Sequence, residues 1–185
     1  MKNLLAAPGP MEALSNRLAQ EEILSLNEKS EQFGLSLTEA DAAALVQTRS
    51  EALAETGRIE IGGATVAKLI DAFCDSAWIN RKDYASTLHE LTELFYTAKN
   101  ETEDQVSDDE LIDFLKDCFE HRCGGSLELL AGRELEKLAE NLRFGVQDYR
   151  NLDHQISFEE DLPAEEEETA EEEWEKDRWE ELENE

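Results

Sequence analysis

Positive charge is scarce in this chain. The 185 residues include 17 lysines and arginines against 46 aspartates and glutamates, which gives a formal net charge of −29. Residues 158–185 carry −14 of this charge, so that the first 157 residues carry the other −15. A surface of this sign repels nucleic acids and anionic membranes, because both are polyanions. The composition therefore argues against these two partners and favours a basic or cationic protein surface.

Cysteine and long apolar runs are also few. Cys74, Cys118 and Cys123 are an odd number of thiols, which does not make a disulfide framework, and free thiols are typical of a reducing cytosol. No run approaches the roughly 20 apolar residues of a membrane helix. The apolar run that ends at Pro8 is too short for a signal peptide. We therefore expect a cytoplasmic protein.

What the chain does contain is the apolar spacing of helices, most clearly in residues 80–100. Five apolar side chains there fall at i, i+4, i+7, i+11 and i+14, which places them on one helical stripe: Tyr84, Leu88, Leu91, Phe95 and Ala98. Leu94 lies beside Phe95 and widens the stripe. We expect this central helix to contact neighbours on two sides, with Phe95 anchoring the core.

Capping residues mark where two further helices begin. Thr38 with Asp41 resembles a capping box, and Ser107 with Glu110 forms one. Gly57 is placed to end the first of these helices. Both helices have an apolar stripe: Ala42, Leu45, Val46 and Leu53, with Arg49 on the same side, in the first, and Leu111, Phe114, Leu115, Cys118 and Phe119 in the second.

Three more helices are predicted by weaker patterns. The first extends from about Met11 to Lys29 and is expected to dock by part of its length. Another extends from about Ala64 to Ala77, and a last one is capped by Ser126. Their apolar positions are, in order, Met11, Leu14, Leu18, Ile23, Leu24 and Leu26; Val66, Leu69, Ile70, Phe73 and Ala77; and Leu127, Ala131, Leu135, Leu138 and Leu142. Gly132 indicates a kink or a close helix crossing there, and residues 58–61 alternate as a short strand would.

These patterns predict an all-α fold, an irregular bundle of five to six helices with a disordered acidic C-terminal tail. Residues 1–33 would form an N-terminal arm and helix, 34–145 the helical domain, and 146–185 a linker and the acidic tail. Blocks of like charge usually stay solvated. Trp174 and Trp179 are the large apolar groups in this acidic field, so they are the expected partner-binding residues.

Several short segments, taken in order, resemble a family of uncharacterised bacterial helical proteins, a domain of unknown function. They include Phe33-Gly34-Leu35, Gly57-Arg58-Ile59-Glu60, Ser107-Asp108-Asp109-Glu110 and Cys123-Gly124-Gly125-Ser126. The resemblance extends over about residues 18–142. It implies no assigned activity, ligand or catalytic residue.

One run carries groups with reactive or metal-binding chemistry. Cys118, His121 and Cys123 lie within six residues, and all three are possible zinc ligands. A structural zinc site needs four ligands, and no second pair follows at a normal spacing. Cys118 also falls on an apolar helix face, where a buried thiol is ordinary. We therefore expect no metal or cofactor and keep these three residues as candidates for an alternative, metal- or thiol-dependent function.

Carboxylates near helices raise two other possibilities, which the spacing argues against. A di-iron bundle uses Glu three residues before His, and no histidine here has it. An EF-hand fails at Gln105 and Leu111, where Gly and Glu are required. Asp109, Asp113 and Asp117 repeat every four residues and end at His121, a pattern that indicates a solvent-exposed face.

The favoured function is that of a non-catalytic cytosolic interaction or adaptor protein that binds a basic partner. Charge of one sign and a tail with two tryptophans are its basis. The alternative is a small protein dependent on metal or thiol at Cys118, His121 and Cys123. A mimic of nucleic acid remains a third hypothesis, because carboxylates can imitate phosphates.

Overall fold

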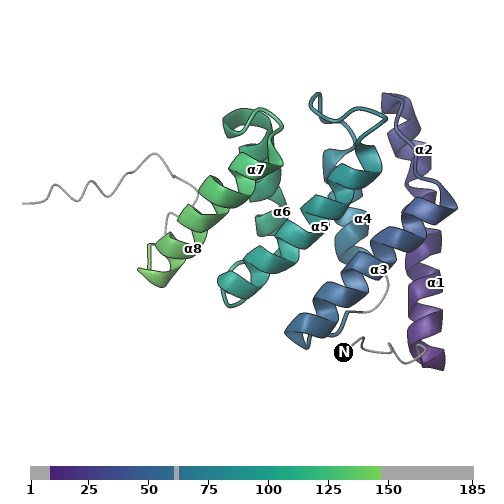
Figure 1. Ribbon diagram of the computed structural model, residues 1–185, viewed down its shortest axis with the longest axis horizontal. Helices are drawn as coiled ribbons and strands as arrows, with labels where there is room; N and C mark the ends of the chain where they lie inside the picture. Colours follow the sequence, from purple (N-terminus) through teal and green to yellow (C-terminus); the bar gives the residue numbers. More distant parts are fainter. Residues whose placement is uncertain (1–8, 61–62, 147–185) are drawn as a thin grey trace, which may run out of the picture. The chain divides into compact units, whose positions relative to one another are not determined.

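The computed structural model describes residues 9–60 and 63–146, and this part of the chain is helical with short connections (Figure 1). Its elements are α1 (Pro10–Ser25), α2 (Asn27–Ser30), the 3₁₀ turn η1 (Glu31–Phe33), α3 (Glu39–Thr56), α4 (Ala64–Phe73), α5 (Tyr84–Glu101), α6 (Asp108–Asp117), the π-helix η2 (Cys118–Arg122), α7 (Leu127–Leu129), the π-helix η3 (Leu130–Leu135) and α8 (Glu136–Arg143). No strand occurs among these residues, so the predicted all-α fold is confirmed. None of the described helices is long and apolar enough to cross a membrane.

The helices pack in two layers. In Figure 1, α1, α3, α5 and the α7–α8 segment follow one another side by side, while α4 and α6 lie behind them. The contacts agree with this arrangement: α3 packs against α1 and α5, and α5 reaches α7. In the second layer α4 packs on α6, and both contact α5. The central helix α5 therefore touches elements of both layers, as its widened stripe predicted.

The core follows the predicted stripes of α3, α5 and α6. Phe95 on α5 is 1% exposed, and its ring meets Tyr96 edge-on with 5.3 Å between centroids. Phe73 of α4 meets Phe119 of η2 in the same way at 5.5 Å. The buried cluster continues through α1, because Ala19 and Ile23 are fully buried in it.

The predicted capping residues act as expected. Thr38 Oγ1 accepts the backbone N–H of Asp41, whose carboxylate accepts the backbone N–H of Thr38 at 2.8 Å. Ser107 and Glu110 repeat this reciprocal pattern at the start of α6. Gly57 ends α3 with a φ of +68°, a left-handed conformation that glycine adopts at little cost. These local bonds fix the entry and exit points of the two helices.

The predicted apolar stripe of α1 holds only in its second half. Ile23 is fully buried as predicted, and Leu24 and Leu26 pack against the core. Met11, Leu14 and Leu18 are instead 80%, 52% and 50% exposed, and Ala19 joins Ile23 on the buried face. The reason is a close backbone approach, because a Cβ on Gly63 would lie 3.2 Å from the carbonyl oxygen of Ala19. Small side chains on both sides let α1 approach the start of α4, and large ones cannot fit there.

Two other sequence interpretations also change. Residues 58–60 form no strand, and Ile59 is 93% exposed. Helix α4 ends at Phe73, before Ala77, which is exposed. Trp78 lies on the surface of the turn that follows, where Gly125 makes room for it: a Cβ at Gly125 would lie 2.5 Å from the Cβ of Trp78.

The last predicted stripe is confirmed in part. Leu135 and Leu138 are buried as predicted, and Leu127, Ala131 and Leu142 are half-buried, with Leu127 and Leu142 packed against the core. The buried face also includes Leu130, Glu134 and Ala139, which the sequence did not predict, and the middle of the segment is the π-helix η3 instead of an α-helix. Gly132 lies inside η3 with no neighbour near its Cβ position, so it marks no close crossing.

Candidate functional site

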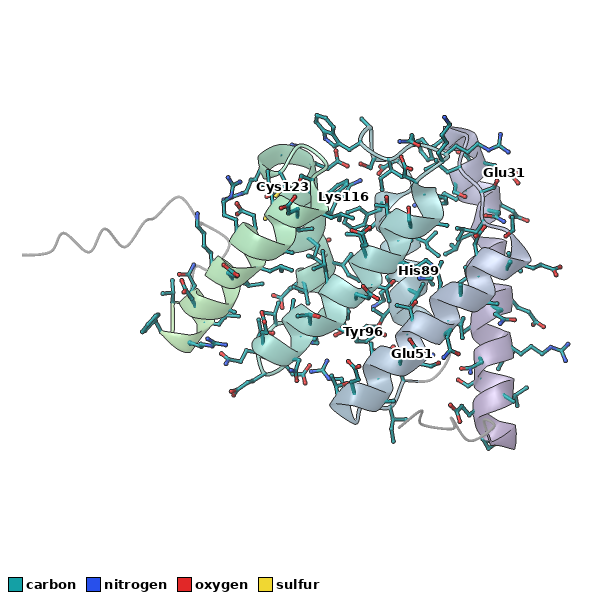
Figure 2. All side chains as sticks on the ribbon, in the orientation of Figure 1. Glu31, Glu51, His89, Tyr96, Lys116 and Cys123 are labelled. Atoms are coloured by element: carbon teal, nitrogen blue, oxygen red, sulfur yellow. The ribbon has the colours of Figure 1, made fainter. Side chains whose placement is uncertain are left out.

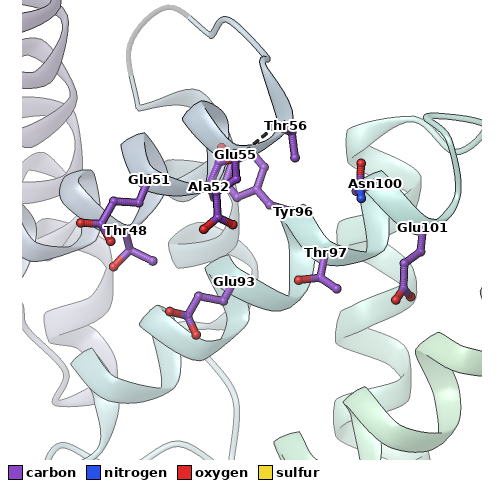
Figure 3. Close-up of a pocket in the computed structure, with 10 residues that line it drawn as sticks. All are labelled: Thr48, Glu51, Ala52, Glu55, Thr56, Glu93, Tyr96, Thr97, Asn100 and Glu101. Atoms are coloured by element: carbon purple, nitrogen blue, oxygen red, sulfur yellow. Dashed lines mark hydrogen bonds between the residues drawn. The ribbon is translucent and has the colours of Figure 1, made fainter. Parts of the chain in front are cut away.

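A groove lies between α3 and α5 in the first layer. It has a volume of about 450 Å³. Each helix contributes five residues (Figure 3): Thr48, Glu51, Ala52, Glu55 and Thr56 from α3, and Glu93, Tyr96, Thr97, Asn100 and Glu101 from α5. Because both helices also contribute to the core, the groove walls are held by buried side chains on their opposite faces.

The groove is strongly acidic. Four glutamates line it, Glu51 and Glu55 from α3 and Glu93 and Glu101 from α5, and all four are exposed. No lysine or arginine is among the described residues that line it. Uncompensated carboxylates facing one concavity raise the local concentration of cations. Threonine hydroxyls and the Asn100 amide supply neutral hydrogen-bonding groups between them.

One wall of the groove rests on a buried polar network. Tyr96 is 2% exposed, and its hydroxyl donates to Glu60 Oε2 at 2.9 Å. The same carboxylate oxygen accepts from Arg49 Nε at 3.3 Å, and Thr65 donates to Oε1 at 3.3 Å. Burial, followed by the charge of Glu60, raises the pKa of Tyr96, so that its hydroxyl stays protonated at neutral pH and remains a donor. This network ties residues 58–60 to α3, α4 and α5.

A second polar contact joins α3 and α5 near the other end of the groove. Thr48 Oγ1 on α3 lies 2.8 Å from Nδ1 of His89 on α5 (Figure 2). With Tyr96 it spaces the two helices along their contact. The groove was not predicted from the sequence, because its carboxylates belong to two helices whose contact is not visible in the spacing of either one. The available signal was their repeat at i and i+4 in Glu51 and Glu55 on the same helix.

Cys118, His121 and Cys123, the candidates for a metal- or thiol-dependent function, differ in their exposure to solvent. Cys118 and Cys123 are 1% and 5% exposed, whereas the side chain of His121 is 75% exposed. Burial, reinforced by the nearby carboxylate of Glu134, raises the pKa of Cys118 to about 12 and that of Cys123 in the same direction. Both thiols are therefore protonated at neutral pH in the metal-free protein, and the thiol is a far weaker nucleophile than the thiolate.

Metal ligation has little geometric support within residues 9–60 and 63–146. These residues contain no group of three His, Cys, Asp or Glu side chains placed to hold a metal ion. Asp104 and Asp108, the acidic residues of the calcium-loop hypothesis, both contact Lys99 Nζ, at 3.2 and 2.9 Å. Trp174 and Trp179, the expected partner-binding residues, lie outside the described ranges.

The carboxylate line on α6 is exposed, as the sequence indicated. Asp113 and Asp117 face solvent, and Asp109 reaches Lys68 Nζ at 2.6 Å. His121 at its end lies 3.9 Å from Asp117. An exposed row with these partners is ordinary surface charge rather than an acid–base device.

A buried acid beside the thiols was not anticipated. Glu134 on η3 is 2% exposed, accepts from Arg133 Nε at 2.6 Å and lies 3.9 Å from Arg122 Nη1. These two arginines neutralise the carboxylate between η2 and η3. Glu134 lies four residues before Leu138 and so shares the predicted apolar face, but a carboxylate was not counted there as a core residue.

These features define an all-helical protein with an acidic groove between its two longest described helices. A family model described as a family of unknown function, DUF6323, matches residues 22–148. The chain belongs to that family, which confirms the resemblance inferred from its short segments. No curated protein and no solved structure matches the chain. The matched range includes both groove helices, most of α1 being outside it.

Proposed function

We propose that the protein is a non-catalytic interaction protein of the cytosol that binds a basic partner, and that the groove between α3 and α5 is a contact site for it. The observation that carries the proposal is the groove itself, about 450 Å³ with four exposed glutamates in its lining. Lysine and arginine side chains are the natural complement of such a surface. The buried, protonated thiols fit a cytosolic setting and leave the metal- or thiol-dependent alternative without a supporting observation.

The groove favours side chains over small cations. Metal ions prefer several oxygens converging on one point, whereas these glutamates lie along two helices. A guanidinium or ammonium group at the end of a long side chain can pair with one carboxylate and leave its stem on the threonines. A short basic segment can therefore contact both walls of the groove.

The test is a titration of ¹⁵N-labelled full-length protein with a ten-residue arginine- and lysine-rich peptide, followed by NMR. The groove variant replaces Glu51, Glu55 and Glu93 by glutamine. The matched control replaces three exposed glutamates of α7 and α8, Glu128, Glu136 and Glu140, so that both variants lose the same charge. We expect the groove variant to bind at least fivefold more weakly than the control, with shifts on α3 and α5.

Equal weakening by both variants would mean that total charge, not the groove, attracts the peptide. A protein that lacks residues 158–185 provides the third arm of the experiment. Loss of binding in this deletion, with the groove variant unaffected, would assign the contact to the acidic segment that contains Trp174 and Trp179. All arms should weaken as salt rises, because exposed charges are screened within about 8–10 Å at physiological ionic strength.

A further inference from the structure

A second groove lies on the face formed by α1, α4 and α6. It has a volume of about 480 Å³ and is lined by ten residues: Glu22, Leu26, Ala64, Ala67, Lys68, Asp71, Ala72, Asp109, Ile112 and Asp113. Its apolar part includes Ala67 and Ile112, which are 8% and 4% exposed, and the half-buried Leu26 and Ala72. These side chains form a floor that is continuous with the core.

An exposed apolar stripe extends this floor along α1. Leu18 lies one helical turn before Glu22, and Glu22 one turn before Leu26, so that all three share one face. Met11 and Leu14 continue that face toward the start of the helix, with exposures of 80% and 52%. Three large apolar side chains at i, i+3 and i+7 beside an apolar groove are the spacing by which one helix binds another.

The rim of the groove determines which helix fits. It carries four carboxylates, Glu22, Asp71, Asp109 and Asp113, against one ammonium group in the lining, that of Lys68. Asp71 and Asp109 are already paired at 2.6 Å, with Lys29 and Lys68. Asp113 is exposed and has no ion-pair partner among the described residues. An apolar floor with a net acidic rim complements a helix with an apolar face and basic flanks.

We propose that this surface, from Met11 and Leu18 to Ile112, docks an amphipathic basic helix of a partner protein. The inference rests on the proposed function, since it names the form in which a basic partner is recognised, but it uses a different surface from the α3–α5 groove. The acidic segment 158–185 of this chain is a poor occupant, because the rim repels its charge.

The experiment uses full-length protein and an 18-residue probe peptide of leucine and lysine with helical period. A peptide of the same composition in scrambled order tests whether the apolar face matters. We expect saturable 1:1 binding of the periodic peptide, at least tenfold tighter than the scrambled one, with NMR shifts on α1, α4 and α6. Equal binding of the two peptides would overturn the proposal, as would failure of the periodic peptide to bind at millimolar concentration.

Matched variants locate the contact. Leu18→Ser should weaken the periodic peptide at least tenfold, whereas Ile59→Ser, which changes an exposed isoleucine elsewhere, should not. Asp113→Asn should weaken it more than Asp117→Asn, one turn further along α6 and outside the groove. Equal effects within either pair would refute the assignment.

Three outcomes separate this inference from the proposed function and from self-association. Shifts confined to Glu51, Glu55, Glu93 and Glu101 would support the proposed function and overturn the helix-docking surface. Sedimentation of the protein alone as a dimer that Leu18→Ser converts to a monomer would show that a second copy covers α1, which also overturns it. Loss of peptide binding in Leu18→Ser, with normal binding in the variant that replaces Glu51, Glu55 and Glu93, would support the inference independently of the α3–α5 groove.

Discussion

The ion pair between Arg49 and Glu60 provides the sharpest test of how the groove wall is held. The Arg49 side chain is 2% exposed, and that of Glu60 is 23% exposed, with 3.3 Å between Nε and Oε2. Arg49 Nη2 also donates to the backbone oxygen of Glu60 at 3.0 Å. Glu60→Gln keeps the shape of the side chain and removes its charge, which leaves a buried guanidinium without its carboxylate.

The expected cost lies between two limits. Exposed ion pairs contribute about 0–1 kcal/mol, and breaking a fully buried pair costs about 3–5 kcal/mol. Since Glu60 retains some contact with water and the amide can still accept from Tyr96, we expect Glu60→Gln to cost about 2–3 kcal/mol. For a protein of this size that corresponds to a fall in Tm of about 6–9 °C.

The assay is urea unfolding followed by far-UV circular dichroism, with Glu21→Gln as the control. Glu21 pairs with Arg17 Nε at 3.1 Å, but the side chains are 60% and 75% exposed, so removing the charge of Glu21 should cost less than about 1 kcal/mol. Equal destabilisation by the two variants would refute the argument that burial sets the strength of the pair. An unchanged m-value is required for the comparison.

Three further outcomes are expected. Phe95→Ala should destabilise the protein by about 3–5 kcal/mol, because Phe95 is 1% exposed. Leu94 is half-buried, so Leu94→Ala should destabilise the protein less in the same unfolding assay. Equal losses of stability would show that Phe95 is not a core residue. Cys118 should react slowly with iodoacetamide at pH 8 in the native protein and fast in urea, because burial raises the pKa of its thiol to about 12; fast native labelling would contradict this. The hydrogen bond from the backbone N–H of Thr38 lowers the pKa of Asp41. A lowered pKa stabilises the fold above the unfolded pKa and ceases to do so as pH falls through the folded value. The destabilisation by Asp41→Asn should therefore be full at pH 7, begin to shrink below about pH 4 and disappear as pH falls through the lower, folded pKa. An effect of Asp41→Asn that stays constant down to pH 3 would contradict that cause.

The sequence was informative where local rules and burial agree. The capping pairs at Thr38 and Ser107, and the five-residue stripe of α5, each combine a backbone requirement with an apolar period, and each is found as predicted. Such elements are specified by residues three or four positions apart. Their prediction does not depend on knowing which other helix they meet.

The candidate site was less predictable, because it depends on contacts between distant residues. Glu60 and Tyr96 are 36 positions apart, yet their hydrogen bond joins residues 58–60 to α5. Alternation around Ile59 indicated a strand, but the acidic member of that alternation is held by Arg49 instead of by a neighbouring strand. On α1 the buried Ile23 was predicted, but Ala19 was missed, because the close backbone approach at Gly63 favours a small side chain there.

The two π-helical segments explain why the last part of the domain was the least predictable. In η2 the N–H of Cys123 donates to the carbonyl oxygen of Cys118 at 2.8 Å, five residues back, so that both thiols turn inward. In η3, Glu134 is buried beside them. An α-helical period assigns Cys118 to the buried face but does not place Cys123, five residues later, with it. Glu134 does fall on the predicted stripe, but as a carboxylate it was not counted as a core residue. The π-helical turns of η2 and η3 lack the regular hydrogen-bond pattern of an α-helix.

The ion pairs of Glu134 with Arg122 and Arg133 offset the cost of burying its charge. Glu134→Gln should therefore destabilise the protein more than Glu136→Gln, which alters an exposed glutamate two residues later. Equal Tm values for the two variants would show that the charge at 134 is not needed to hold η2 and η3 together.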